Sequence, residues 1–168
     1  MKIRDIMTRD PITIPVDGMV REAARLLRKY RIGGLPVMKD GKVEGIVTET
    51  DILSLLDTGD LSEDLWLPSP LEIIEVPIRE YINWEKTKRA LSNIGDMEVR
   101  RVMSSPVIAI GEDADLEDAA SLMLREGIAR LPVLRDDKLV GIVTRADIVR
   151  GIGAAADAER EGRGQGSS

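Results

Sequence analysis

The sequence predicts an α/β (α+β) fold in which two related repeats each pack helices on one face of a small β-sheet. Three observations carry this prediction. The chain of 168 residues matches itself when it is shifted by about 96 positions. Within each copy, short runs of β-forming residues flank a segment with helical periodicity. The apolar residues are mostly Ile, Val, Leu, Met and Ala, with no Phe, which suits aliphatic strands packed against Ala-containing helices.

The duplication divides the chain into four parts. Residues 1–56 form repeat 1, residues 57–97 an insert, residues 98–152 repeat 2, and residues 153–168 a C-terminal tail. Between the repeats, roughly 20 of about 52 aligned positions are identical without a gap, which is too many for chance. A unit this small cannot bury its apolar face alone. The two copies are therefore expected to pack against each other about a pseudo-twofold axis.

Each repeat is expected to begin with a strand followed by a helix. The strands are predicted at residues 12–14 and 107–110. Helical spacing then starts at Val20 in repeat 1 and at Leu116 in repeat 2. Two acidic residues could cap these helices, and glycines are expected to end them; the residues concerned are Asp17 and Asp113, then Gly33-Gly34 and Gly127.

A hairpin and a second helix complete each repeat. In repeat 1 the strands are predicted at residues 35–38 and 43–47, joined by a turn at Asp40-Gly41. The corresponding turn of repeat 2 holds Asp136-Asp137. The second helix is expected to begin at Thr48 or Thr144.

The insert and the tail have patterns of their own. Residues 65–70 contain two prolines and are expected to be extended, and a helix is predicted near 84–94, capped by Asn83 and closed by Gly95. The insert is interpreted either as an arm that lies over the module or a partner, or as a plain connector. From residue 153 the tail is expected to be flexible, with an extension of the last helix through 154–161 as the alternative.

Composition excludes several kinds of chemistry. The chain has no His and no Cys, so zinc, copper or haem sites with protein nitrogen or sulfur ligands are excluded, as are thiol nucleophiles and Ser-His hydrolysis. A net charge of −6 argues against nucleic acid as the main partner. The N-terminus lacks the apolar run of a signal peptide, and no stretch is long enough for a membrane helix. A cytoplasmic location and no membrane partner are therefore expected.

One motif, Gly-Ile-Val-Thr-x-x-Asp-Ile, occurs at residues 45–52 and again at 141–148. Its Thr and Asp are expected at a strand-to-helix junction, where free backbone N–H groups and the helix dipole favour anions. The Thr hydroxyl could bind a phosphate or ribose oxygen, and the carboxylate could accept hydrogen bonds from both hydroxyls of a ribose. The same spacing is also that of a capping box, which would serve helix initiation alone. Both interpretations stay open at this point.

The combination of Met7 and Met103, the two Leu-Pro-Val strands and the repeated Thr-x-x-Asp ending resembles a tandem pair of CBS domains, known as a Bateman module. The resemblance covers both repeats, and the insert is similar to that of small stand-alone archaeal CBS proteins. It implies two clefts between the repeats that bind AMP, ADP, ATP or S-adenosyl compounds, which Mg²⁺ can accompany. It also implies a homodimer of CBS pairs and regulation rather than catalysis.

The resemblance assigns residues to two clefts. In cleft 1, Thr144 and Asp147 would hold phosphate or ribose, and Arg130 would contact a phosphate. The base in cleft 1 would rest on Asp10, Ile12, Thr13, Ile14, Ile32 and Gly33. In cleft 2, Thr48 and Asp51 would take the polar role, and the base would rest on Pro106, Val107, Ile108, Ile110, Ile128 and Ala129. Gly34 replaces the basic residue there, which points to a less charged adenosyl ligand or to an empty cleft.

Two other functions remain as alternatives to a sensor of an adenosine-containing molecule. The chain could be a scaffold whose insert binds an unknown protein partner, and nucleic-acid binding is a weaker possibility because aromatic stacking residues are few. Catalysis is not expected, since the chain lacks a nucleophile with its base and a phosphate-binding Gly-rich loop. No catalytic residue and no metal site are assigned.

Overall fold

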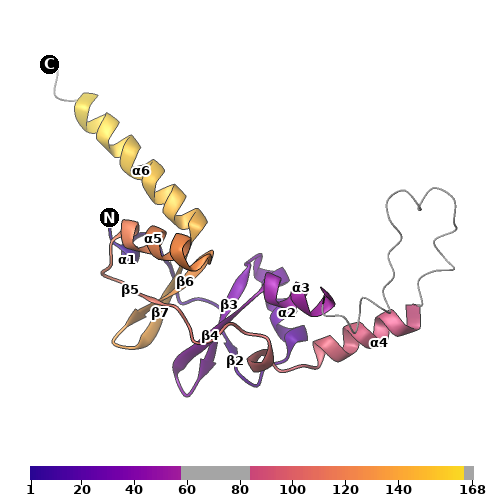
Figure 1. The fold of residues 1–168 in the computed structure, drawn as a ribbon. Coiled ribbons are helices and arrows are strands. Elements are labelled where there is room, and N and C mark those ends of the chain that lie inside the picture. The colour runs from indigo at the N-terminus through magenta and orange to yellow at the C-terminus, as the bar shows by residue number, and fades with distance from the viewer. Residues whose placement is uncertain (58–83, 165–168) are drawn as a thin grey trace, which may run out of the picture. The chain divides into compact units, whose positions relative to one another are not determined.

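A computed structural model describes residues 1–57 and 84–164 of the chain (Figure 1). Its contacts divide the chain into two compact units. Unit 1 contains Met1–Thr13, Met38–Gly45 and the residues from Ser105 on, and unit 2 contains Ile14–Val37 and Ile46–Ser104. The predicted mixed fold is confirmed, because each unit combines helices with a small sheet.

Unit 1 is built on a four-stranded sheet with the order β1-β7-β6-β5. Its strands are β1 (Thr8–Arg9), β5 (Ile110–Gly111), β6 (Arg130–Arg135) and β7 (Lys138–Thr144). Strands β6 and β7 form an antiparallel hairpin, β1 adds to β7 antiparallel, and β5 adds to β6 in parallel. The helices are α1 (Ile3–Ile6), α5 (Leu116–Glu126) and α6 (Arg145–Gly164), and α6 contacts both α1 and α5.

Unit 2 follows the same plan with a three-stranded sheet in the order β2-β3-β4. Its strands are β2 (Ile14–Pro15), β3 (Gly34–Lys39) and β4 (Lys42–Thr48), with the hairpin tip grouped in unit 1. Helix α2 (Val20–Tyr30) contacts both α3 (Glu49–Asp57) and α4 (Trp84–Gly95). A 3₁₀ helix, η2 (Val99–Arg101), follows α4. The predicted insert helix is thus confirmed, while Asn83 and residues 65–70 lie outside the described residues.

The two compact units do not coincide with the two sequence repeats, because the repeats exchange their first segments. Ile3, from the start of repeat 1, is fully buried in the core of unit 1, most of which comes from repeat 2. Val99, the matching residue of repeat 2, is fully buried in unit 2. Its N–H donates to the carbonyl oxygen of Gly18 at 2.8 Å. Each core therefore needs a residue from the other repeat.

Aliphatic side chains fill both cores, as the composition predicts. The remaining core of unit 1 consists of Met7, Leu116, Ala119, Met123, Leu131, Val133, Val143 and Ile148. In unit 2 the buried set comprises Ile14, Val20, Ala23, Leu27, Leu35, Val37 and Val47. Ala23 and Ala119 on the first helices are thus core positions, and Met7 contributes its side chain to the core of unit 1.

The predicted caps of the first helices are wrong. Helices α2 and α5 begin after Met19 and Asp115, so neither Asp17 nor Asp113 is an N-cap. Contacts between distant segments explain this difference, because main chain outside each helix's own repeat accepts the first helical N–H group. The N–H of Val20 donates to Met97 O at 2.8 Å, and that of Leu116 donates to Met1 O at 3.1 Å.

The helix ends and the first strands also differ from the prediction. Helix α2 ends at Tyr30 with Arg31 in the left-handed conformation (φ 53°), so Gly33-Gly34 does not end it, whereas Gly127 (φ 67°) does end α5. The strands predicted at 12–14 and 107–110 are two-residue strands that share only Ile14 and Ile110 with the prediction. In unit 1 the reason is that β5 pairs with β6 at just two positions.

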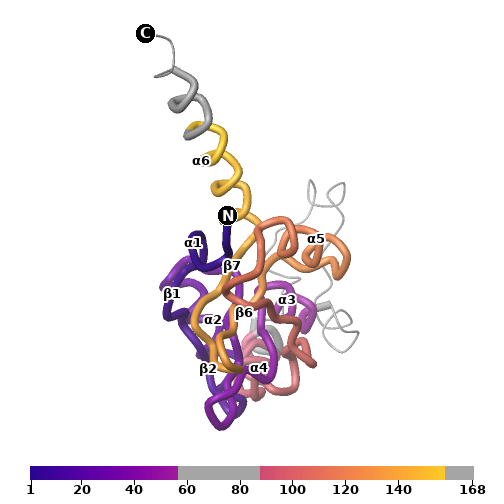
Figure 2. Tube along the Cα trace, turned by 90° about the vertical axis from the view of Figure 1, so that its left-hand side faces the viewer, coloured from indigo at the N-terminus to yellow at the C-terminus, as the bar shows by residue number. Residues whose placement is uncertain are grey.

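The hairpins and the second helices are close to the prediction. Both turns use two residues with positive φ, Asp40-Gly41 (49° and 77°) and Asp136-Asp137 (49° and 59°), as a tight hairpin turn requires. Helices α3 and α6 begin immediately after Thr48 and Thr144. Helix α6 continues through residues 154–161, the extension that the sequence allows, and extends well past α5 (Figure 1 and Figure 2).

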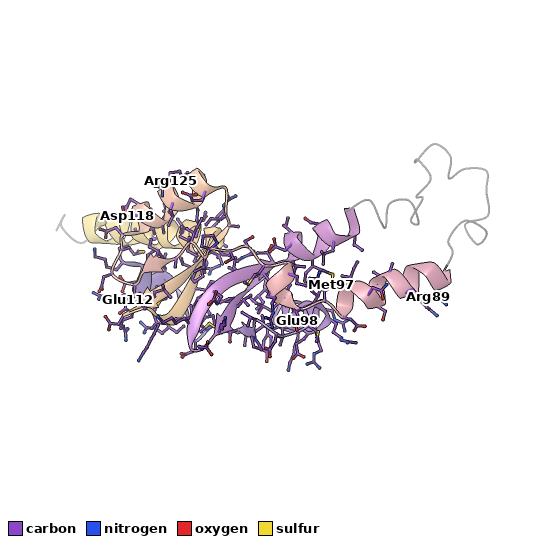
Figure 3. The ribbon with its side chains drawn as sticks, turned by 60° about the horizontal axis from the view of Figure 1, so that its bottom comes forward. Arg89, Met97, Glu98, Glu112, Asp118 and Arg125 are labelled. Carbon is purple, nitrogen blue, oxygen red and sulfur yellow. The ribbon has the colours of Figure 1, made fainter. Side chains whose placement is uncertain are left out.

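Ion pairs attach the N-terminal segment and β5 to unit 1. Lys2 Nζ lies 2.9 Å from Asp115 Oδ1. Arg135 donates twice to Glu112, once from Nε to Oε1 and once from Nη2 to Oε2 at 2.6 Å. The Glu112 side chain, labelled in Figure 3, is only 10% exposed. These pairs couple folding to protonation.

The direction of that coupling follows from the pKa shifts. Hydrogen bonds from Arg135 hold the pKa of Glu112 below its ordinary value of 4.5, although burial acts to raise it. Lys2 lowers the pKa of Asp115 in the same way, and Asp115 raises the pKa of Lys2. The carboxylates stabilise the fold above their unfolded-state pKa and lose this effect as the pH falls through the folded-state pKa. The Lys2 contribution is instead lost as the pH rises through its raised pKa.

We expect Glu112→Gln to lower the free energy of unfolding at neutral pH, with the difference from wild type shrinking as the pH falls below 4.5. Urea denaturation at neutral pH and at about pH 3 measures this difference. Glu117→Gln, which removes an exposed carboxylate of α5, is the control for the loss of one negative charge. A Glu112→Gln difference that stays the same at both pH values would contradict the prediction.

Candidate functional site

The repeated motif lies in each unit where the hairpin ends and the second helix begins. In unit 1, Arg130 at the start of β6 is directly opposite Thr144 at the end of β7. The first helical N–H, that of Arg145, donates to Ala129 O at 3.0 Å. This pairing brings Arg130 and Thr144, two residues assigned to cleft 1, into cross-strand contact distance.

Asp147 is the buried carboxylate of this junction. Its residue is 4% exposed, and its Oδ2 accepts the N–H of Thr144 at 2.8 Å and the hydroxyl of Thr144 at 2.6 Å. The N–H of Asp147 in turn donates to Thr144 Oγ1 at 3.3 Å. Thr144 and Asp147 therefore hold each other through three hydrogen bonds at the start of α6.

The second carboxylate oxygen of Asp147 has a different partner. Arg150, one helical turn further along α6, donates from Nη2 to Asp147 Oδ1. The pair joins a side chain that is 72% exposed, on Arg150, to one that is 5% exposed, on Asp147. Both oxygens of Asp147 therefore already accept at least one hydrogen bond within unit 1.

Unit 2 repeats the arrangement with one difference. Asp51 Oδ2 accepts the N–H of Thr48 at 2.7 Å and its hydroxyl at 2.9 Å, and the N–H of Asp51 donates to Thr48 Oγ1 at 3.2 Å. Asp51 Oδ1 lies 3.5 Å from the hydroxyl of Ser104. Ser54 stands at the position that matches Arg150, and its hydroxyl donates to Thr50 O at 2.8 Å.

These bonds are those of a capping box, so the structural interpretation of the Thr-x-x-Asp motif is confirmed in both copies. The geometry also limits the chemical interpretation. A carboxylate oxygen accepts about two hydrogen bonds, and Oδ2 of each aspartate has both from its own threonine. Only Oδ1 is left for a ligand hydroxyl, and the threonine hydroxyl hydrogen is already donated. An aspartate that accepts both hydroxyls of a ribose must therefore give up a hydrogen bond, either the one from Arg150 or Ser104 on Oδ1 or one from its threonine on Oδ2.

The other residues assigned to cleft 1 are divided between the units. Asp10, Ile12 and Thr13 follow β1 and belong to unit 1 with Thr144 and Asp147. Thr8 pairs with Ile142, two residues before Thr144, and Asp10 adopts a positive φ of 47°. The unit 2 members are Ile14, Ile32 and Gly33, and the side chain of Ile14 is fully buried in that core.

The residues assigned to cleft 2 are divided in the same way. Thr48 and Asp51 belong to unit 2, while Pro106, Val107, Ile108, Ile110, Ile128 and Ala129 belong to unit 1. Ile108, Ile110 and Ile128 are half-buried and pack against the core of unit 1. Gly33 O accepts the N–H of Glu49 at 3.2 Å, which matches the bond from Arg145 to Ala129 in the other unit. The two clefts stay predictions.

Over the described residues, no three acidic side chains cluster closely enough to hold a metal ion. No helix within the same range has the length and apolar character needed to cross a membrane.

The similarity to known proteins lies in the same two repeats of the chain. The family model for the CBS domain matches residues 3–58 and residues 99–154, which together make up most of the chain. The chain is a CBS domain protein. Its two CBS domains are the two sequence repeats, so the resemblance drawn from the motifs is confirmed.

Several relatives resemble this pair of CBS domains along nearly their whole length. The Methanocaldococcus jannaschii protein MJ1426 is 41% identical over 154 residues, which is 90% of this chain and 91% of that protein. The structure of CBSX2 in complex with AMP has a TM-score of 0.66 at 26% identity, covering 92% of this chain and 98% of that chain. The CBS domain pair of MJ0100 in complex with 5′-methylthioadenosine and S-adenosyl-L-methionine has a TM-score of 0.67 at 27% identity, with the same coverage.

Two residues that contact the motif carboxylates, Arg150 and Ser104, were not predicted from the sequence. Arg150 had a signal, because a side chain three residues after Asp147 on a helix lies on the same face. Ser104 could be found only by aligning it with Thr8 and recognising the exchange, since it contacts Asp51 from the other repeat. Ser104 also forms an isolated antiparallel β-bridge with Ile46, which matches the pairing of Thr8 with Ile142 in unit 1.

Proposed function

We propose that this CBS domain protein is a regulatory module that binds an adenosine-containing small molecule and is not an enzyme. The ligand class is AMP, ADP, ATP or an S-adenosyl compound, which Mg²⁺ can accompany. The solved relatives that contain AMP, or methylthioadenosine with S-adenosylmethionine, support this class. Because regulation requires a ligand to prefer one state of its protein, binding is expected to change shape or association.

The observation that carries the proposal is the convergence of three polar residues at one junction in unit 1. Arg130 lies opposite Thr144 across the hairpin, and the buried Asp147 is hydrogen-bonded to Thr144. An arginine and an aspartate held at one helix N-terminus suit a ligand with both a phosphate and a ribose.

The two copies of the motif differ in charge, which supports different ligands at the two sites. Repeat 2 has Arg130 and Arg150, whereas repeat 1 has Gly34 and Ser54 at these positions. We expect the site of repeat 2 to prefer a phosphorylated adenosyl ligand and the site of repeat 1 to prefer a less charged one.

The assembly that we propose is a homodimer in the cytoplasm. Unit 1 exposes three large apolar side chains on α5 and α6: Leu124 is 77% exposed, Val149 68% and Ile152 56%. In unit 2, Leu53 on α3 is 62% exposed. Exposed apolar side chains on neighbouring helices are typical of a protein interface.

Isothermal titration calorimetry tests the proposal with AMP, ADP, ATP, S-adenosylmethionine and methylthioadenosine. The proteins are the wild type, Asp147→Asn and Asp51→Asn, which remove one motif carboxylate each. We expect at least one ligand to bind the wild type, and a phosphorylated one to lose affinity by about tenfold or more in Asp147→Asn alone. Light scattering of the same samples with and without ligand gives the mass of the assembly.

The alternative function, a scaffold whose insert holds a protein partner, gives a different result in this experiment. None of the five compounds would bind, and the three proteins would behave alike. That outcome would contradict the adenosyl sensor.

A further inference from the structure

We infer that Arg150 competes with the ligand for Asp147, so that this one side chain sets the affinity of the site in repeat 2 for a ribose. The inference rests on the proposed function, because it concerns the same carboxylate. It assigns Arg150 a role in specificity for which the motif itself gives no indication.

Asp147 has few hydrogen-bond acceptor positions left for a ligand. Oδ2 already accepts the N–H and the hydroxyl of Thr144, at 2.8 and 2.6 Å. Arg150 Nη2 donates to Oδ1, which leaves one acceptor position on that oxygen. A ribose presents two hydroxyl donors. A ribose that uses both donors on Asp147 must therefore displace either Arg150 or Thr144.

Displacement of Arg150 is the easier of these two changes. Thr144 closes the start of α6, so its release would leave a helical N–H without its acceptor. The Arg150 side chain is 72% exposed, and water can solvate its guanidinium as soon as it leaves Asp147. Because only the guanidinium of this pair is exposed and it regains water when the pair opens, the competition should reduce affinity by a modest factor rather than prevent binding.

Repeat 1 provides the natural comparison, because Ser54 stands where Arg150 does. Its hydroxyl donates to Thr50 O, the usual bond of a serine inside a helix, and not to Asp51. The Ser104 hydroxyl lies 3.5 Å from Asp51 Oδ1, a long contact that a ligand hydroxyl can replace readily. The motif carboxylate of repeat 1 is therefore more available than that of repeat 2.

The test is the affinity for adenosine, a neutral ligand that contains the ribose but no phosphate. Asp51→Ala is introduced first to remove the carboxylate of repeat 1, and Arg150→Ser is then added to this background. Arg125→Ser is the matched control, because Arg125 is an exposed arginine of α5, also in unit 1, that pairs with Glu126 (Figure 3). We expect Arg150→Ser to bind adenosine about threefold to fivefold more tightly than its parent, and Arg125→Ser to bind like the parent.

Salt gives an independent measurement on the same proteins. Because adenosine is uncharged, raising KCl from about 50 to about 500 mM should tighten its binding to the parent by screening the Arg150–Asp147 pair. The Arg150→Ser protein should show no such gain.

The outcomes separate the inference from the proposed function. If the parent binds adenosine and Arg150→Ser binds it equally well or more weakly, the inference is wrong while the sensor proposal stands. If the parent does not bind but Arg150→Ser does, the competition is confirmed. If neither protein binds adenosine and the wild type binds none of the adenosyl compounds, both proposals are wrong.

Discussion

Replacing Gly141 by alanine is expected to destabilise the protein by about 2–3 kcal/mol, because the added methyl group has no space in unit 1. A Cβ at this position would lie 2.5 Å from Met7 Sδ and 3.0 Å from the carbonyl oxygen of Thr8. Strand β1 pairs with β7 here in antiparallel fashion, with Arg9 opposite Gly141. Urea denaturation monitored by circular dichroism measures the loss.

Two further variants make the Gly141 prediction specific. Gly111→Ala, in strand β5, is the control, because a Cβ there has no neighbour within 4 Å and should change stability by less than about 0.5 kcal/mol. Met7→Ala removes the sulfur that the added methyl group would strike, so the two changes together should cost less than the sum of their separate costs. Simple additivity in this cycle would refute the proposed clash with Met7.

Asp147→Ala is expected to lower the free energy of unfolding by about 2–4 kcal/mol, apart from any effect on a ligand. The variant removes the acceptor of the Thr144 N–H and hydroxyl bonds at a residue that is 4% exposed. It also removes the partner of Arg150. The same substitution at Asp51, which is only half-buried, should cost about 1–2 kcal/mol.

Asp147→Asn separates the two roles of the carboxylate in this experiment. Its amide oxygen can still accept from Thr144, so most of the stability should return while the charge does not. Equal losses of stability for Asp147→Ala and Asp51→Ala would show that burial does not set the strength of these caps. All three variants are compared with the wild type by urea denaturation without ligand, so that stability is measured separately from binding.

The motif chemistry could be predicted because its residues are close in sequence. Thr144 and Asp147 are three residues apart, and a strand-to-helix junction fixes their geometry within one helical turn. The hairpin register that places Arg130 opposite Thr144 also follows from local signals, the Asp136-Asp137 turn and the strand lengths. For such elements, the periodicity of apolar residues and the identity of the turn residues are enough to predict the local structure.

Most of the features that the sequence did not predict depend on contacts between distant segments. Asp17 and Asp113 satisfy the local rule for a cap, but Met97 O in the insert and Met1 O in repeat 1 accept the first helical N–H groups. Likewise, the first strands are short because a two-residue parallel pairing with β6 limits β5. No local pattern distinguishes a segment that completes its own repeat from one that completes the other.

The exchange of first segments has a consequence for the order in which the protein can fold during synthesis. Unit 2 lacks Val99 until repeat 2 has begun to leave the ribosome, so repeat 1 cannot complete its core by itself. Ile3 is made about a hundred residues before Ala114, whose carbonyl oxygen accepts its N–H. The segment that contains Ile3 therefore cannot form these contacts until repeat 2 is made. Slow, nonlocal closure of this kind favours folding of each unit only after its segments from both repeats have been made.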